Sequence, residues 1–453
     1  MPRPRMRTAC SRFVAGGLLT VALAAQERPA PDQAAQPPTI ETEAEPWSLH
    51  GQVTTVIQGH GAFPSPYAGA NSLESRKETR TSFTTTLFLG RRLWKGAEFY
   101  LNPEAAAGQG ISQVMGLAGA PNGETYRVGS SKLKVALARL FLRQTWGLGG
   151  GSEAVAPDAN QLGGSRQTRR IVMTLGRFSA GDIFDQNAYA HDPRSQFLNW
   201  ALMDTATWDY PADTRGYTWG AALEVYGDAW ALRAGSFLEP KEANGLLFDH
   251  HVARAHGDVL EVEHGHELGG LAGRIRVLGY ANHARMGDYR ESLAASPARP
   301  DVTTTRREGR LKYGWGLSAE QALTADLGAF LRAGWNDGRT ETWAFTEVDR
   351  TVAGGVSLAG PRWGRPADRL GLAAIVNDLA PDHRAYLAAG GYGFIVGDGR
   401  LDPGQERILE AYYALEAHPG ITVSLDAQRV QDPAFNRDRG PISIFAVRVH
   451  GQF

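Results

Sequence analysis

The chain has 453 residues and a net charge of −1, with 47 basic against 48 acidic side chains, so no basic excess points to a nucleic-acid-binding protein. Mean hydropathy is −0.31, and beyond the N-terminal segment no stretch approaches the roughly 18 consecutive apolar residues of a membrane-spanning helix. A membrane β-barrel stays compatible with this composition, because its strands alternate between apolar and polar residues.

The N-terminus is typical of a secreted protein. Four arginines precede the apolar run 13–25, which ends in small residues and is too short for a membrane-spanning helix. We therefore expect residues 1–25 to be a signal peptide. The single cysteine, Cys10, lies before the apolar run, so the mature chain would contain no disulfide, thiolate metal site or cysteine nucleophile. Residues 26–46 are rich in Pro, Gln, Ala and Glu, and we expect a disordered periplasmic leader there.

Residues 47–453 alternate in sixteen segments, an even number that suits a closed bacterial barrel. The segments are 48–58, 80–92, 97–104, 133–145, 169–178, 215–226, 229–238, 258–267, 272–283, 307–321, 323–335, 342–358, 367–377, 407–418, 420–430 and 442–453. Short connections alternate with longer ones, except that 146–168 is long and Gly-rich and 336–341 is short. The sequence predicts an all-β, 16-stranded antiparallel transmembrane barrel with short periplasmic turns and long outer loops.

Individual segments support an apolar outer face and a polar inner face. In 323–335, Leu, Ala and Trp occupy every second position, while the positions between them include Asp326 and Arg332. The last segment alternates in the same way and ends at Phe453, a terminal aromatic resembling the signal that barrel-assembly machinery reads. A soluble β-sandwich also alternates, but its core could not bury so many unpaired charges.

A barrel of this size leaves an aqueous lumen, so a channel is the expected function. Charges of both signs face inward in similar number, which suits a neutral polyhydroxylated solute better than an ion of one sign. For each charge the alternative is a solvated position away from the constriction. The candidate pore-lining residues are Arg139, Arg143, Arg233, Glu261, Glu263, Arg274, Arg276, Arg310, Asp326 and Arg332.

The longest loop, 179–214, carries many aromatic residues, and we expect it to fold inward and narrow the pore. Aromatic faces beside Asp, Asn and Arg suit sugar recognition, although these rings could equally form a small core of the loop itself. The candidate constriction residues in this loop are Asp182, Asp185, Tyr189, Asp192, Arg194, Trp200, Trp208, Asp209 and Asp213.

Three stretches carry a family resemblance. Residues 182–220 (DIFDQNAYAHDPRSQFLNWALMDTATWDYPADTRGYTWG), 138–149 (ARLFLRQTWGLG) and 436–441 (NRDRGP) resemble the carbohydrate-selective porin (OprB-like) family. The resemblance implies an outer-membrane porin through which sugars, glucose-like monosaccharides among them, diffuse passively. It also implies a constriction lined by arginines and acidic residues from the wall and from inward loops. No nucleotide motif is present, so no cofactor or energy source is expected.

Other interpretations stay open at this point. The pore could be a general porin or prefer another small solute, and the barrel could be an adhesin or an enzyme. His191, Asp192 and Ser195 supply catalytic residue types without a nucleophile motif. Five histidines within 250–266 could bind a metal or be ordinary loop residues.

The expected partners are carbohydrate solutes, outer-membrane lipid and lipopolysaccharide, and the assembly machinery at Phe453, with no nucleic acid. The barrel could be a monomer or a homotrimer, because alternation along the chain does not separate a subunit interface from a lipid-facing wall.

Overall fold

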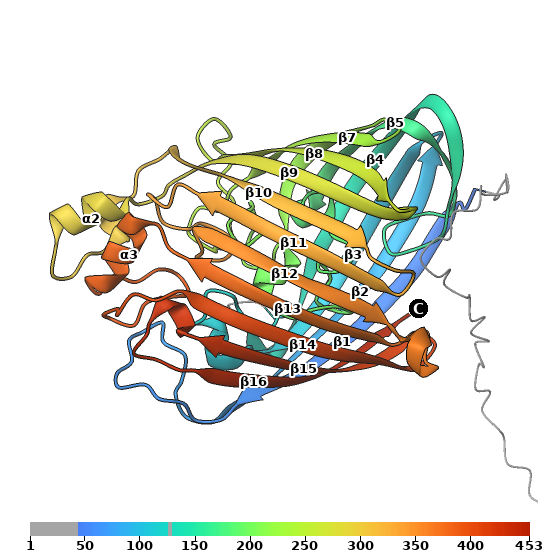
Figure 1. The fold of residues 1–453 in the computed structure, drawn as a ribbon. Helices are drawn as coiled ribbons and strands as arrows, with labels where there is room; N and C mark the ends of the chain where they lie inside the picture. Colours follow the sequence, from blue (N-terminus) through green and yellow to red (C-terminus); the bar gives the residue numbers. More distant parts are fainter. Residues whose placement is uncertain (1–43, 126–128) are drawn as a thin grey trace, which may run out of the picture. The chain divides into compact units, whose positions relative to one another are not determined.

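Sixteen antiparallel strands close into a barrel in the computed structural model, which describes residues 44–125 and 129–453 (Figure 1). Each strand pairs with its neighbours in the sequence, and β1 pairs with β16 to close the sheet. The strands are β1 (Trp47–His60), β2 (Glu78–Trp94), β3 (Ala97–Gly108), β4 (Ser130–Val155), β5 (Gly164–Phe178), β6 (Thr218–Tyr226), β7 (Trp230–Leu238), β8 (His256–Leu268), β9 (Leu271–Ala284), β10 (Arg310–Ala322), β11 (Leu327–Asn336), β12 (Arg350–Ala359), β13 (Arg369–Asp378), β14 (Glu406–His418), β15 (Ile421–Gln431) and β16 (Ile442–Gln452). The predicted fold class is confirmed.

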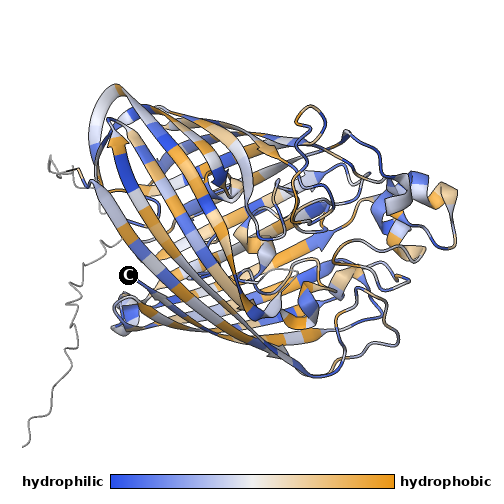
Figure 2. Ribbon diagram, turned by 180° about the vertical axis from the view of Figure 1, so that it is seen from behind, coloured by the Kyte–Doolittle hydropathy of each residue, from blue (hydrophilic) through white to orange (hydrophobic). Residues whose placement is uncertain are grey.

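The two faces of the wall differ as the alternation predicts. Along β16, Phe445 and Val447 are 62% and 40% exposed, whereas Arg448 between two exposed valines is fully buried. Apolar and polar residues accordingly alternate along the strands in Figure 2. Exposed apolar side chains outside and buried charges inside are the reverse of a soluble protein, and they fit a wall that faces lipid.

Helical segments are short. They are η1 (Ile111–Val114), η2 (Ala180–Asp182), α1 (Trp200–Met203), α2 (Tyr289–Ala295), η3 (Val302–Thr305), η4 (Gly360–Trp363), α3 (Pro381–Ala388) and η5 (Pro433–Phe435). All but η4 lie in the long connections at one end of the barrel, which we call the loop side; the opposite end is the turn side. None of the helices in the described residues has the length and apolar character needed to cross a bilayer.

The predicted strand 342–358 is eight residues too long at its start, because β12 begins at Arg350. The backbone N–H groups of Trp343, Ala344 and Phe345 donate to the carboxylate of Asp209 instead of to a neighbouring strand. The connection between β11 and β12 therefore spans 337–349, and it is long, as a loop-side connection should be.

The long Gly-rich connection expected at 146–168 is also corrected. β4 continues to Val155 and pairs with β5 up to Gly164, which leaves only 156–163 as the connection. The sequence did not indicate this extension, because the glycines at 147 and 149–151 have no side chains that could alternate between the two faces of a strand.

The predicted signal peptide, 1–25, lies outside the described residues, as does the predicted leader 26–46 up to residue 43.

Candidate functional site

The segment 179–217 between β5 and β6 packs against the inner face of the barrel wall. The Phe197 ring lies 4.8 Å from Tyr412 of β14 and 5.7 Å from Phe330 of β11, measured between ring centroids. On another part of the wall, Phe184 lies 6.2 Å from Phe237 of β7. The aromatics of this segment thus bury themselves on the wall rather than only on each other.

Charged wall residues satisfy the backbone of this segment. Arg332 of β11 is fully buried, with its Nη1 2.5 Å from the Asp185 carboxylate. It also donates to the backbone carbonyls of Asp185 at 3.0 Å and Ala190 at 2.8 Å. Arg448 donates to the carbonyls of Pro193 and Gln196, at 2.6 and 2.8 Å. Buried backbone groups need such partners, so these inward charges hold the segment in place.

Carboxylates on the wall bind the N–H groups of the same segment. Glu261 of β8 accepts from the Asp185 N–H at 2.6 Å. Glu410 of β14 accepts from the Leu198 N–H at 2.5 Å and the Asn199 N–H at 3.2 Å. Both glutamates are fully buried. Basic wall residues therefore bind backbone carbonyl groups of the segment, and acidic wall residues bind its backbone N–H groups.

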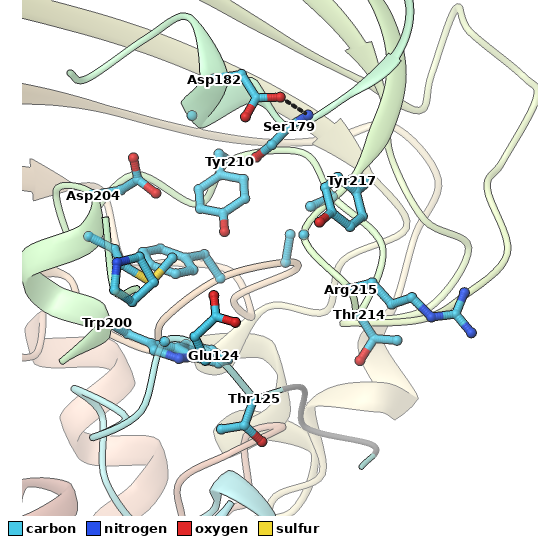
Figure 3. Close-up of a pocket in the computed structure, with 18 of the residues that line it drawn as sticks. Glu124, Thr125, Ser179, Asp182, Trp200, Asp204, Tyr210, Thr214, Arg215 and Tyr217 are labelled. Carbon is cyan, nitrogen blue, oxygen red and sulfur yellow. Dashed lines mark hydrogen bonds between the residues drawn. The ribbon is translucent and has the colours of Figure 1, made fainter. Parts of the chain in front are cut away.

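A cavity of about 320 Å³ remains beside the segment (Figure 3). One part of its lining is aromatic: Trp200 stacks on Phe345 with ring centroids 5.6 Å apart and planes at 10°, and Tyr210 lies 4.6 Å from Phe345. Tyr217 contributes another ring. Glu124 lies within the same space in Figure 3, so a carboxylate stands near the aromatic part.

Ion pairs of both signs border this cavity. Arg139 of β4 forms a two-pronged contact with Asp182, at 2.7 Å from Nε and 2.5 Å from Nη2. Arg194 Nε lies 2.8 Å from a Glu124 oxygen, and its Nη2 lies 3.6 Å from Glu104. The cavity thus offers fixed donors and acceptors, the chemistry of hydroxyl recognition.

The pKa values of acidic loop residues at the cavity shift in different directions. Burial raises the pKa of Asp204, whose Oδ1 lies 3.8 Å from His191 Nδ1 and has no hydrogen-bond partner within residues 44–125 and 129–453. Burial likewise raises the pKa of Glu124, against the opposing effect of Arg194. Burial would also raise the pKa of Asp182, but the Arg139 guanidinium outweighs it and lowers that pKa.

A second cavity, of about 910 Å³, lies toward the turn side. Its lining includes Arg143 and Arg233, and Asp182 borders both cavities. Asp182, the ion-pair partner of Arg139, is therefore common to the lining of both cavities.

The remaining candidate residues have structural surroundings of their own. Arg233 contacts Glu261 and Glu263, and Arg276 lies between Glu263 and Glu320. Among the other wall candidates, Arg274 lies near Glu263 and Glu320, Arg310 lies near Asp288 and Glu291 on the loop side, and Asp326 lies in the turn before β11, 3.8 Å from Arg362. In the loop, Tyr189 lies over Gly328, Trp208 is fully buried, and the Asp209 carboxylate binds residues 343–345. The loop candidates at the smaller cavity are Asp192, Arg194, Trp200 and Asp213.

Sequence reasoning missed several cavity residues. Tyr210 and Tyr217 lie in the recognised motif and could have been chosen with the other aromatics. Glu124 and Phe345 come from other loops, and nothing in their local sequence indicates that they meet the 179–217 segment.

The histidines within 250–266 are not gathered with other ligands: in the described part of the chain, no group of three or more His, Cys, Asp or Glu side chains could hold a metal ion. His264 instead packs on Trp230, with ring centroids 4.2 Å apart.

A closed 16-stranded barrel with an apolar outer face and ion-paired cavities inside has the architecture of bacterial outer-membrane porins. The family described as "Carbohydrate-selective porin, OprB family" matches residues 70–453, so the chain belongs to that family. The resemblance that the sequence indicated is therefore confirmed. The protein is a carbohydrate porin, a channel of the bacterial outer membrane and not an enzyme.

A solved structure with a TM-score above 0.5 agrees on the fold. The high-pH structure of Pseudomonas putida OprB is similar over 90% of this chain and 94% of that one, with 16% identity and a TM-score of 0.67. The outer membrane channel DcaP of Acinetobacter baumannii covers 90% and 97%, with 9% identity and a TM-score of 0.49. The comparison with curated proteins gave no match.

Proposed function

We propose that the cavity of about 320 Å³ is the sugar-selecting part of the pore, and that glucose-like monosaccharides occupy it one at a time. One observation carries the proposal: the same cavity has both an aromatic surface and ion pairs in its lining. Trp200 and Tyr210, each packed on Phe345, form the aromatic surface, and Arg139–Asp182 and Arg194–Glu124 are the ion pairs. Its volume lies at the small end of the range for ligand sites, roughly 300–1,000 Å³.

The two parts of the lining would act on different parts of a sugar. The apolar C–H face of a pyranose packs on an aromatic ring, and its hydroxyl groups exchange hydrogen bonds with guanidinium and carboxylate groups. Arg139 is paired with Asp182, Arg194 with Glu124 and Arg177 with Asp213, so most charges of the lining are compensated by a partner of opposite sign. A neutral solute would therefore pass with weak binding and no energy source.

Replacement of Trp200 by Ala tests this proposal. We expect the ratio of glucose to equal-sized amino-acid influx in liposome swelling to fall at least about threefold, the loss of one aromatic contact. Trp219→Ala is the matched control, since Trp219 lies on β6, is 38% exposed and borders neither cavity described above. An unchanged ratio in Trp200→Ala would remove this cavity as the selecting element.

We further propose that residues 1–25 direct secretion, that Phe453 is read by the assembly machinery, and that lipopolysaccharide surrounds the loop-side half of the wall. The barrel would function as a monomer or a homotrimer, and either state is compatible with one sugar path through each barrel.

A further inference from the structure

β4 and β5 continue beyond the barrel wall on the turn side. The β3–β4 pairing ends at Ala97 and Gln144, whereas the β4–β5 pairing continues to Val155 and Gly164. On the other edge, β5 meets β6 only from Arg170 onward. Residues 145–169 thus form a two-stranded ribbon with the connection 156–163 at its tip. We call this unit the strap, and Figure 1 shows it arching at the turn side from the ends of β4 and β5.

The tip of the strap returns to the inner face of the wall. Asn102 Nδ2 donates to Asn160 Oδ1 at 2.9 Å, and Arg143 Nη1 donates to the Asn160 carbonyl at 2.9 Å. The Leu162 N–H donates to the Tyr100 hydroxyl at 3.2 Å, and the Leu162 side chain is 3% exposed. Asn102 and Tyr100 are fully buried inward-facing residues of β3, so the tip occupies the mouth of the barrel.

The segment before β1 holds the tip from the other side. The Gly163 N–H donates to Glu45 Oε2 at 2.8 Å, and the Glu45 N–H donates to the Gly163 carbonyl at 3.0 Å. Arg92 Nη2 donates to the same carbonyl at 3.3 Å. The tip is therefore fixed at several points by groups from different parts of the chain.

The larger cavity lies between this tip and the 179–217 segment. Residues 158–162 line it from the strap, and Asp182, Ile183 and Gln186 line it from the segment. Amide, guanidinium and carboxylate groups make up much of the rest of the lining, among them Gln167, Arg170 and Glu224. The cavity, of about 910 Å³, is thus bounded on two sides and rich in hydrogen-bonding groups of both signs.

We propose that the strap and the wall beneath it form a second saccharide-binding site, in series with the first and wide enough for a disaccharide. Asp182 lines both cavities, so the second site would adjoin the first at this carboxylate. Two weak sites in series let a solute enter and leave, as channels require. The inference rests on the proposed function, because it assumes a neutral sugar as the solute.

Shortening the strap tests the proposal. Val155 and Gly164 are directly paired, so Asn-Gly in place of residues 156–163 closes the hairpin with a two-residue turn. The control replaces Gly269 and Gly270, the two-residue turn between β8 and β9 on the same side, by Asn-Gly. A second variant, Asn160→Ala with Gln161→Ala, keeps the full length of the strap and removes two amides.

The measurement is block of ion current by glucose and by maltose in oriented single channels, with sugar added to one side. With maltose on the turn side, both strap variants should raise the half-blocking concentration at least threefold, and the turn control should not change it. With glucose on the loop side, the strap variants should match the wild type.

Equal half-blocking concentrations in the wild type and both strap variants, from both sides, would overturn the second site. That result leaves the first site intact if Trp200→Ala still weakens block from the loop side. A wild-type channel that no sugar blocks would instead overturn the proposed function.

Discussion

Some charged residues on the inner wall, Arg332 and Arg448 among them, hold the 179–217 segment in place. Arg332 is fully buried and bonds both the Asp185 carboxylate and the backbone of the segment, and it borders neither cavity described above. A buried ion pair is weak evidence for stability by itself, but removal of one partner leaves the other charge uncompensated.

Replacement of Arg332 by Met should therefore free the segment from the wall. The Asp185 carboxylate would lose its cation, at a cost of about 3–5 kcal/mol to the free energy of unfolding. We expect larger and noisier single-channel currents and a lower temperature of heat-induced unfolding on gels. Arg274→Met is the control, because that side chain is 55% exposed and its ion pairs contribute about 1 kcal/mol or less. Currents equal to those of the wild type would contradict an anchoring role.

At the level of elements, alternation predicts strands wherever one face meets lipid and the other meets polar groups. It extended β12 too far, because Trp343 and Phe345 occupy every second position as in a strand, although residues 342–349 form a buried loop. It ended the fourth strand early, because the glycines at 147 and 149–151 have no side chain and so show no alternation between apolar and polar residues. The number and order of strands depended on neither error.

The candidate site is less accessible to sequence reasoning than the strands. The aromatic motif within 182–220 indicated a loop that packs inside the barrel, and Trp200 and Asp182 border the smaller cavity. Glu124 and Phe345 reach it from loops distant in sequence, and that meeting depends on tertiary packing. Inward position alone did not separate Arg139, at the cavity, from Arg332, under the segment.

The contact between the 179–217 segment and β11 also requires a glycine. A Cβ on Gly328 would lie 2.0 Å from Tyr189 Cζ, so Gly328→Ala must displace that ring. We expect a loss of about 1–3 kcal/mol in the free energy of unfolding and increased current noise. Gly279→Ala on β9 is the control, since a Cβ there meets nothing within 4 Å. If the two variants behave alike, Tyr189 does not depend on close packing against β11.

At the level of the whole molecule, one seam closes the barrel. β1 and β16 pair from Gln52–Gln452 to His60–Ile444. Phe453 extends the seam by one step: its N–H donates to the Gly51 carbonyl at 3.1 Å, and its carbonyl accepts from the Gly51 N–H at 3.1 Å. Its side chain is 63% exposed on the outside, where an assembly factor could contact it before closure.

Deletion of Phe453 should therefore lower the yield of folded barrel without changing its selectivity. The residue contributes two hydrogen bonds at the end of a seam that already holds nine residue pairs, so a barrel that has closed should stay closed. It borders neither of the two cavities, so the glucose to amino-acid ratio in liposome swelling should match the wild type. Phe453→Tyr keeps the ring and both hydrogen bonds and should restore the yield, measured as the heat-modifiable fraction in outer membranes. A normal yield after deletion would mean that the seam forms without a terminal aromatic, and a changed ratio would mean that the seam reaches the sugar path.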